Sequence, residues 1–78
     1  MTENEAKIIL DKLYAIGEQT AVQPADVERV VSDTLSIEFD ASVVTESDFF
    51  AMFISDNNGV MIYNDGGVSI MYDGWVMV

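Results

Sequence analysis

Carboxylates are the side chains through which this sequence offers chemistry. Two pairs have the close spacing that lets two acids act on one bond: Glu38 with Asp40, and Glu46 with Asp48. One protonated and one ionised carboxyl group can together hydrolyse a glycosidic bond. A chain of 78 residues has little room for a ligand pocket of about 300 Å³ or more, and close acid pairs arise by chance in so acidic a chain. We therefore predict that the protein is not an enzyme.

The other residue types exclude most catalytic and metal sites. Histidine is absent, which removes the usual general base and the commonest metal ligand, and cysteine is absent, which removes thiolate nucleophiles, disulfides and zinc sites. No Gly-x-Ser-x-Gly elbow and no glycine-rich phosphate cradle occurs. The stretch 56–59 has its glycine at the wrong offset for a calcium loop. We expect no metal and no other cofactor.

The charge is strongly one-sided. Fourteen Asp and Glu stand against three basic residues, for a net charge of -11, and the basic residues are Lys7, Lys12 and Arg29. Eight carboxylates follow Arg29 with no cation among them. Nucleic acids and anionic membranes bind through Lys and Arg, so neither is expected as a direct ligand. The natural partner is a basic protein, most often one that holds DNA or RNA. Solubility alone is the competing explanation of the charge.

The first half of the chain predicts two helices. Thr2 and Glu5 have the spacing of a capping box, and apolar residues follow at helical intervals, which predicts a helix over about 3–16. Pro24 suits the first position of a second helix over about 24–35.

A connector over 36–48 separates the helices from the second half of the chain. Its apolar residues leave pairing at a sheet edge open. The stretch 46–55 is compatible with a strand or a third helix, and we favour the strand because its Phe-rich run leads directly into a turn signal.

Turn residues divide the last part of the chain, about 49–78, into β-prone segments. Asn, Asp and Gly, which tolerate the positive φ of tight hairpins, gather at 56–59, 64–67 and 73–74. The sequence therefore predicts a single α+β domain. Its two N-terminal helices pack on one face of a C-terminal three- to four-stranded antiparallel β-meander.

Alternation along the meander separates two faces. One set of positions is predicted to face the core: Val60, Ile62, Val68, Ile70 and Tyr72. The opposite set holds Met61, Tyr63, Ser69 and Met71, and Trp75 and Met77 join it if the register allows. Methionine and aromatic residues are frequent at adaptable binding surfaces, so the second set is a candidate contact patch. Burial of this patch by the connector or by a homodimer is the alternative.

In size and composition the chain is similar to the nucleic-acid mimics and other inhibitors of phages and mobile elements, such as anti-CRISPR, anti-restriction and uracil-DNA-glycosylase inhibitor proteins. No diagnostic motif of these families occurs, and no site residue is taken from them. The resemblance implies a stoichiometric inhibitor that occupies the basic nucleic-acid-binding surface of a partner. Carboxylates would supply electrostatic complementarity and larger side chains the anchors: Glu38, Asp40, Glu46, Asp48, Asp56, Asp65, Asp73, Tyr63, Met71 and Trp75.

Two other functions remain open. An immunity protein or antitoxin that neutralises a basic nuclease would use the same physics, and a structural homo-oligomer would carry its charge only for solubility. The acidic start and the lack of an apolar run of about 20 residues predict a soluble, unprocessed cytoplasmic protein, in the host cytoplasm if a phage encodes it.

Overall fold

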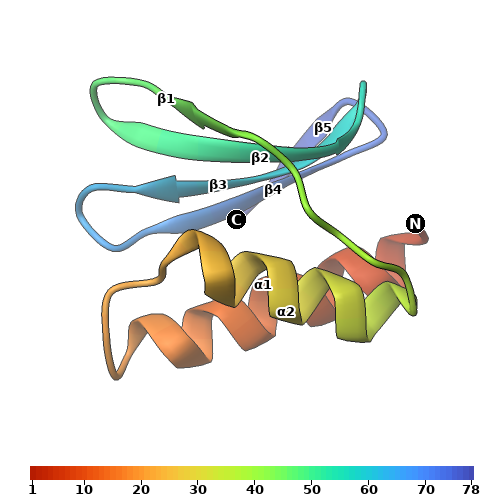
Figure 1. Ribbon diagram of the computed structural model, residues 1–78, viewed down its shortest axis with the longest axis horizontal. Helices are drawn as coiled ribbons and strands as arrows, with labels where there is room; N and C mark the ends of the chain where they lie inside the picture. The colour runs from red at the N-terminus through yellow and green to blue at the C-terminus, as the bar shows by residue number, and fades with distance from the viewer.

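A helical layer and a sheet make up the protein in the computed structural model, which describes all 78 residues, Met1–Val78 (Figure 1). Helices α1 (Glu3–Gly17) and α2 (Pro24–Leu35) run antiparallel beneath the sheet. The strands are β1 (Val43–Thr45), β2 (Phe49–Ser55), β3 (Asn58–Tyr63), β4 (Val68–Tyr72) and β5 (Trp75–Met77). They form one antiparallel sheet in the order β1-β2-β3-β4-β5. The predicted α+β fold is confirmed.

Helix α1 begins with the capping box that the sequence predicts. The Glu5 amide donates to the Thr2 hydroxyl oxygen at 3.1 Å, and the Thr2 amide donates to Glu5 Oε1 at 2.7 Å. These bonds satisfy donors that the first turn of a helix leaves unpaired. The helix then buries side chains at helical spacing: Ala6, Ile9, Leu10 and Leu13. Through this buried stripe, α1 packs on the core of the protein.

Helix α2 has Pro24 at its first position, as predicted, and Asp26 in its first turn. Asp26 Oδ2 accepts a hydrogen bond from the backbone N–H of Gln23 at 2.8 Å, which caps the helix. The chain leaves the helix through Ser36, whose φ of 56° is in the left-handed region. Phe39 then attaches the connector to α2 and the core. Its side chain is buried, and its backbone N–H donates to Ser32 Oγ at 3.0 Å.

The sheet is larger at its start than the sequence predicts. The stretch from Phe49 is a strand and not a helix, as favoured, and β1 adds an edge strand from within the connector. Val44 of β1 lies opposite Ala51 of β2. The meander therefore has five strands, where three or four were expected.

The core lies between the helices and the sheet. From the sheet it takes side chains that are at most 5% exposed: Met52, Val60, Ile62, Val68 and Ile70. From the helices it takes Ile9, Leu13, Val27 and Val31, none of which is exposed. The predicted core set is confirmed, with Tyr72 packed at its margin. Neither helix has the length and apolar character needed to cross a membrane.

A side-chain hydrogen bond ties α1 to β4. The Tyr14 hydroxyl donates to the carbonyl oxygen of Val68 at 3.0 Å. Because this bond joins two layers, we expect Tyr14→Phe to lower the free energy of unfolding by about 0.5–1.5 kcal/mol in urea denaturation. Tyr72→Phe, at the opposite end of β4, is the matched control. Equal stabilities for the Tyr14→Phe variant and the wild type would show that this bond does not hold the layers together.

Candidate functional site

The face of the sheet that points away from the helices carries no charged side chain. Directly paired residues of an antiparallel sheet point to the same side, so the register identifies this face. We call it the outer face, and its residues are Val44, Phe49, Ala51, Phe53, Gly59, Met61, Tyr63, Ser69, Met71 and Val76.

Close packing orders the outer face. Phe53 lies over Gly59 so closely that a Cβ added to Gly59 would be 2.8 Å from Phe53 Cδ1. The rings of Phe49 and Tyr63 lie 5.5 Å apart between centroids. The Tyr63 hydroxyl and Ser69 Oγ share a hydrogen bond of 3.0 Å, which satisfies a serine that is fully buried. The aromatic side chains of the face thus pack against neighbouring residues of the sheet.

Apolar surface on this face remains open to solvent. Val44 is 42% exposed, Phe53 43% and Val76 60%. Contiguous exposed apolar surface marks interaction sites more often than chance allows. The outer face is therefore the first component of the candidate site.

The predicted contact patch lies largely on this face, with one change. Met61, Tyr63 and Met71 share it, whereas Trp75 and Met77 lie on the helix-facing side. Trp75 pairs with Tyr72 across the β4–β5 turn and therefore points to the same side as Tyr72. The register thus separates Trp75, at the sheet edge and 77% exposed, from the other two predicted anchors.

All carboxylates of the sheet lie in its turns. At one end, two hydrogen bonds join the β1–β2 and β3–β4 turns. The side-chain Nδ2 of Asn64 donates to the Ser47 carbonyl oxygen at 2.8 Å, and the backbone N–H of Asn64 donates to the Asp48 carbonyl oxygen at 2.8 Å. These two turns carry Glu46, Asp48 and Asp65. We call this the three-carboxylate end.

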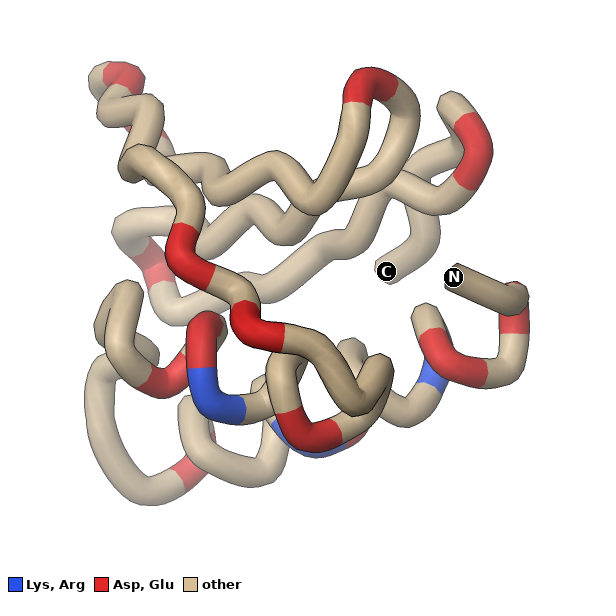
Figure 2. Tube along the Cα trace, turned by 45° about the vertical axis from the view of Figure 1, so that its right-hand side comes forward, with Lys and Arg blue, Asp and Glu red and all other residues tan.

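The opposite end of the sheet joins the other two turns in the same way. The Asp73 amide donates to Asn58 Oδ1 at 3.0 Å, and the Gly74 amide donates to the Asn57 carbonyl oxygen at 2.9 Å. Asp56 and Asp73 lie in these turns, which we call the two-carboxylate end. Strand β3 runs between the ends, and its six residues put them roughly 17 Å apart. Figure 2 shows the acidic residues at the tips of the sheet.

Glu38 and Asp40 lie apart from both ends. They flank the buried Phe39 in the connector, which climbs from α2 to β1 along the side of the molecule (Figures 1 and 2). Both side chains are exposed. The predicted site residues thus fall into the two ends, the outer face, the connector and the edge residue Trp75.

Two hollows are present, and both are shallow. One, of about 270 Å³, lies at the three-carboxylate end and is lined by Asp48, Tyr63, Asn64 and Asp65. The other, of about 220 Å³, lies between the α1–α2 connection and the β3–β4 turn. Both are below the usual range for small-molecule sites. No three acidic residues come together in a way that would hold a metal ion.

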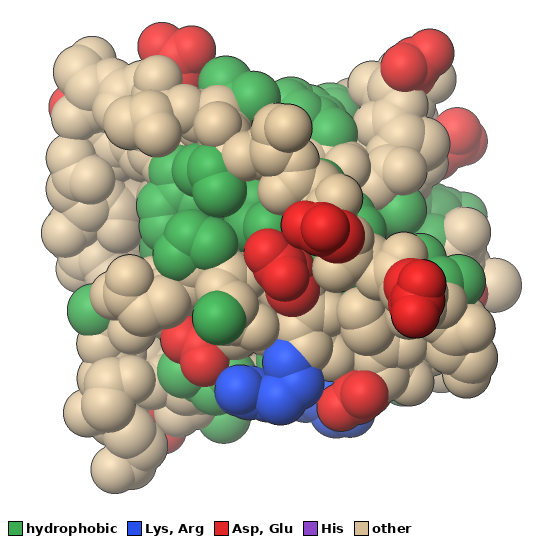
Figure 3. Space-filling view, viewed as in Figure 1, with side chains coloured by type: hydrophobic (Ala, Val, Ile, Leu, Met, Phe, Trp, Pro, Cys, Tyr) green, Lys and Arg blue, Asp and Glu red, His purple; other side chains and the backbone are tan.

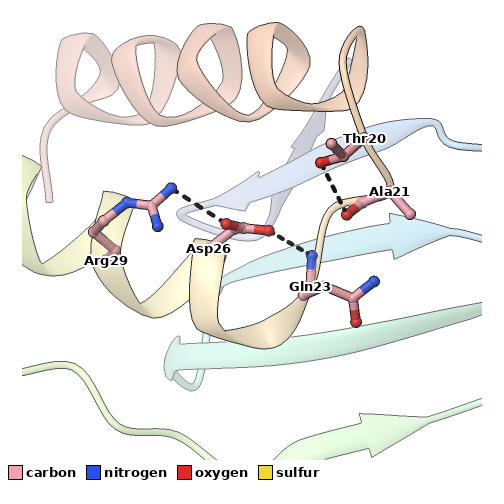
Figure 4. Close-up of polar contacts among 5 residues, drawn as sticks. All are labelled: Thr20, Ala21, Gln23, Asp26 and Arg29. Carbon is pink, nitrogen blue, oxygen red and sulfur yellow. Dashed lines mark hydrogen bonds and ion pairs between the residues drawn. The ribbon is translucent and has the colours of Figure 1, made fainter.

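All three basic side chains lie in the helical layer, and two of them pair with carboxylates of their own helix. Arg29 contacts Asp26 Oδ1 at 3.2 Å (Figure 4), and Lys7 lies 3.7 Å from Glu3 Oε2. Figure 3 shows the Lys and Arg side chains of the viewed face below the sheet, over the helices. No cation neutralises the carboxylates of the sheet.

Uncompensated charge makes folding stability depend on salt. A net charge of -11 on a small domain opposes compaction, and dissolved salt screens that repulsion. We expect the midpoint of thermal unfolding to rise by about 4–8 °C between low and high NaCl, which corresponds to about 1 kcal/mol. Circular dichroism at a series of NaCl concentrations measures it. A midpoint that does not change or that falls would contradict the claim that charge repulsion destabilises the folded protein.

The site thus combines an uncharged, partly exposed face with carboxylates in hydrogen-bonded turns at both of its ends. Such an arrangement suits contact with a macromolecule better than chemistry on a small molecule. No protein-family model matches the chain, and comparisons with curated proteins and with solved structures found no significant match.

Proposed function

We propose that this chain is a non-enzymatic binding protein that inhibits a partner by occupying the partner's basic nucleic-acid-binding surface in a one-to-one complex. The observation that carries the proposal is the segregation of charge. All carboxylates of the sheet lie in its turns, and no Lys, Arg or His occurs after Arg29. A surface of one sign attracts a surface of the other sign and speeds their association.

The placement of the carboxylates supports imitation of a nucleic acid. The hydrogen bonds of Asn64 and Asn58 tie the turns in pairs, so the negative charges lie in two groups at opposite ends of the sheet. An uncharged strip roughly 17 Å long separates the groups. Two phosphate backbones present a comparable pattern across a groove of DNA, which is about 12 Å wide in the major groove. Phage and mobile-element inhibitors of the anti-restriction and anti-CRISPR kind are the class that this proposal implies.

A nuclease-neutralising immunity protein or antitoxin is a form of the same proposal, in which the partner is a cognate toxin. The homo-oligomer is a different proposal, and the exposed apolar outer face is the observation that favours it. The two differ in salt dependence. The affinity of a complex driven by carboxylates falls steeply as the salt concentration rises, whereas the affinity of a homodimer with an apolar interface does not.

Affinity capture tests the proposal. The protein is immobilised, bacterial lysate is passed over it at low salt, and bound proteins are eluted with a salt gradient and identified by mass spectrometry. We expect a nucleic-acid-binding protein in one-to-one proportion, and we expect added DNA or RNA to compete for it. Recovery of only a salt-resistant dimer of the chain itself would reject the proposal.

A further inference from the structure

Charge alone gives no role to the outer face between the two carboxylate ends. Phe53 and Val76 expose 43% and 60% of their surface there, and Met71 pairs directly with Val76. Electrostatic attraction of a basic surface needs none of these side chains. Aromatic and methionine side chains, in contrast, are enriched at protein interfaces, where a few desolvated residues carry most of the binding energy.

The size of the outer face argues against a second copy of this chain as its occupant. Five strands about 4.8 Å apart and a length of roughly 17 Å give an area of roughly 400 Å². Two such faces together would bury roughly 800 Å², which is below the range of about 1,200–2,000 Å² for stable complexes. A partner that also reaches the turns buries more surface.

Charge argues in the same direction. Two copies stacked through this face would bring together two chains of net charge -11, with the uncompensated carboxylates of each sheet around the contact. No cation of either copy lies in the sheet to offset them. A partner with Lys or Arg beyond both ends of an apolar strip would match the charge of the carboxylate ends and the apolar character between them.

We propose that the outer face is the anchoring part of the contact, and that it binds a protein surface in which an apolar ridge is flanked at both ends by Lys or Arg. This inference rests on the proposed function and names the chemistry of its partner. The ridge packs on Phe53, Met61 and Met71, while the cations meet the three-carboxylate end and the two-carboxylate end. The contact is therefore apolar at its centre and electrostatic at its ends.

Two synthetic peptides of identical composition are the probes. One is an amphipathic helix with a leucine stripe flanked by lysine, and the other has the same residues in an order that breaks the stripe. Binding to the isotope-labelled protein is followed by backbone-amide NMR, which also locates the contact. We expect the striped peptide to bind at least about 10-fold more tightly, equivalent to about 1.4 kcal/mol. Its shifts should centre on the outer face.

Variants of matched exposure identify the surface. Phe53→Thr with Val76→Thr removes apolar groups from the outer face while keeping residues that favour strands. Ile37→Thr is the control, because Ile37 is 45% exposed, close to the 43% of Phe53, but lies in the connector. The outer-face variant should lose the preference for the striped peptide, and the control should keep it. Val44→Thr alone provides a second outer-face variant if the double variant unfolds.

Equal binding of the two peptides, unchanged in the outer-face variants, would overturn the inference. So would a dimer of the wild type in sedimentation equilibrium that the outer-face variant abolishes. The proposed function is judged separately, by whether nucleic acid competes with the captured partner. If nucleic acid competes with the captured partner and the outer-face variants still bind that partner normally, the proposed function stands and only the inference about the outer face fails. If the outer-face variants lose the partner but nucleic acid does not compete for it, only the proposed function fails.

Discussion

Replacing Ile70 by Ala is expected to lower the free energy of unfolding by about 2–5 kcal/mol, the largest effect on stability that we predict. Ile70 is fully buried at the centre of β4, on the helix-facing side of the sheet. Truncation removes favourable burial and leaves a cavity that the surrounding layers fill only in part. A domain of 78 residues has about 4–12 kcal/mol of stability in total, so the variant should be close to unfolding.

Urea denaturation of the Ile70→Ala variant measures this loss. Ile37→Ala is the matched control, because it makes the same chemical change at a residue that is 45% exposed in the connector. Its effect should stay within about 0.5 kcal/mol. Similar losses for the two variants would mean that the core does not lie between the helices and the sheet as described.

The largest expected effect on binding comes from neutralising the three-carboxylate end. The change is Glu46→Gln with Asp48→Asn and Asp65→Asn, which keeps hydrogen-bond acceptors at all three positions, including the one that Asp65 Oδ1 offers to the Gly67 amide. We expect affinity for the basic partner to fall about 100-fold, chiefly through slower association, because charged contacts at the rim of an interface act mainly on the association rate.

The control removes the same charge from the helical layer. Asp11→Asn with Glu18→Gln and Asp33→Asn takes three negative charges from exposed positions on or next to α1 and α2. Both triple variants have a net charge of -8, because each removes three from -11. Surface plasmon resonance at several salt concentrations compares them. If both triple variants lose affinity equally, net charge and not its position on the sheet governs binding.

Elements with local signals were predictable from the sequence. The capping box of Thr2 and Glu5, and Pro24 at the first position of α2, fixed where both helices begin. The dipeptide Asp73-Gly74 has φ values of 50° and 84°, the left-handed conformations of a tight two-residue hairpin. These features depend on neighbouring residues alone, so they can be recognised without knowing the fold.

Long-range pairing was harder to predict. Strand β1 has only three residues, and although Val43, Val44 and Thr45 favour strands, so short a run does not show that it pairs with β2. The carboxylates gather into two groups because turns distant in sequence, such as those of Ser47 and Asn64, are bonded to each other. Those contacts have no sequence signal. The close packing of Phe53 on Gly59 is likewise a consequence of register.

The position of Trp75 had a usable signal. A two-residue turn makes its flanking residues direct partners, and partners point to the same face. Residues 73–74 form that turn, so Trp75 follows Tyr72 to the helix-facing side, while Val76 takes the place on the outer face. Applying the turn geometry to the alternation pattern would have separated Trp75 from Tyr63 and Met71.

Displacement of nucleic acid from the partner is the measurement that tests the central claim most directly. The captured partner is bound to fluorescently labelled DNA or RNA, and this protein is titrated in while fluorescence anisotropy is recorded. We predict that anisotropy falls to the value of free nucleic acid at a one-to-one ratio of protein to partner. The triple variant of the three-carboxylate end should need about 100-fold more protein. Anisotropy that stays constant or rises, as in a complex of all three molecules, would contradict the occupation of the nucleic-acid-binding surface by this chain.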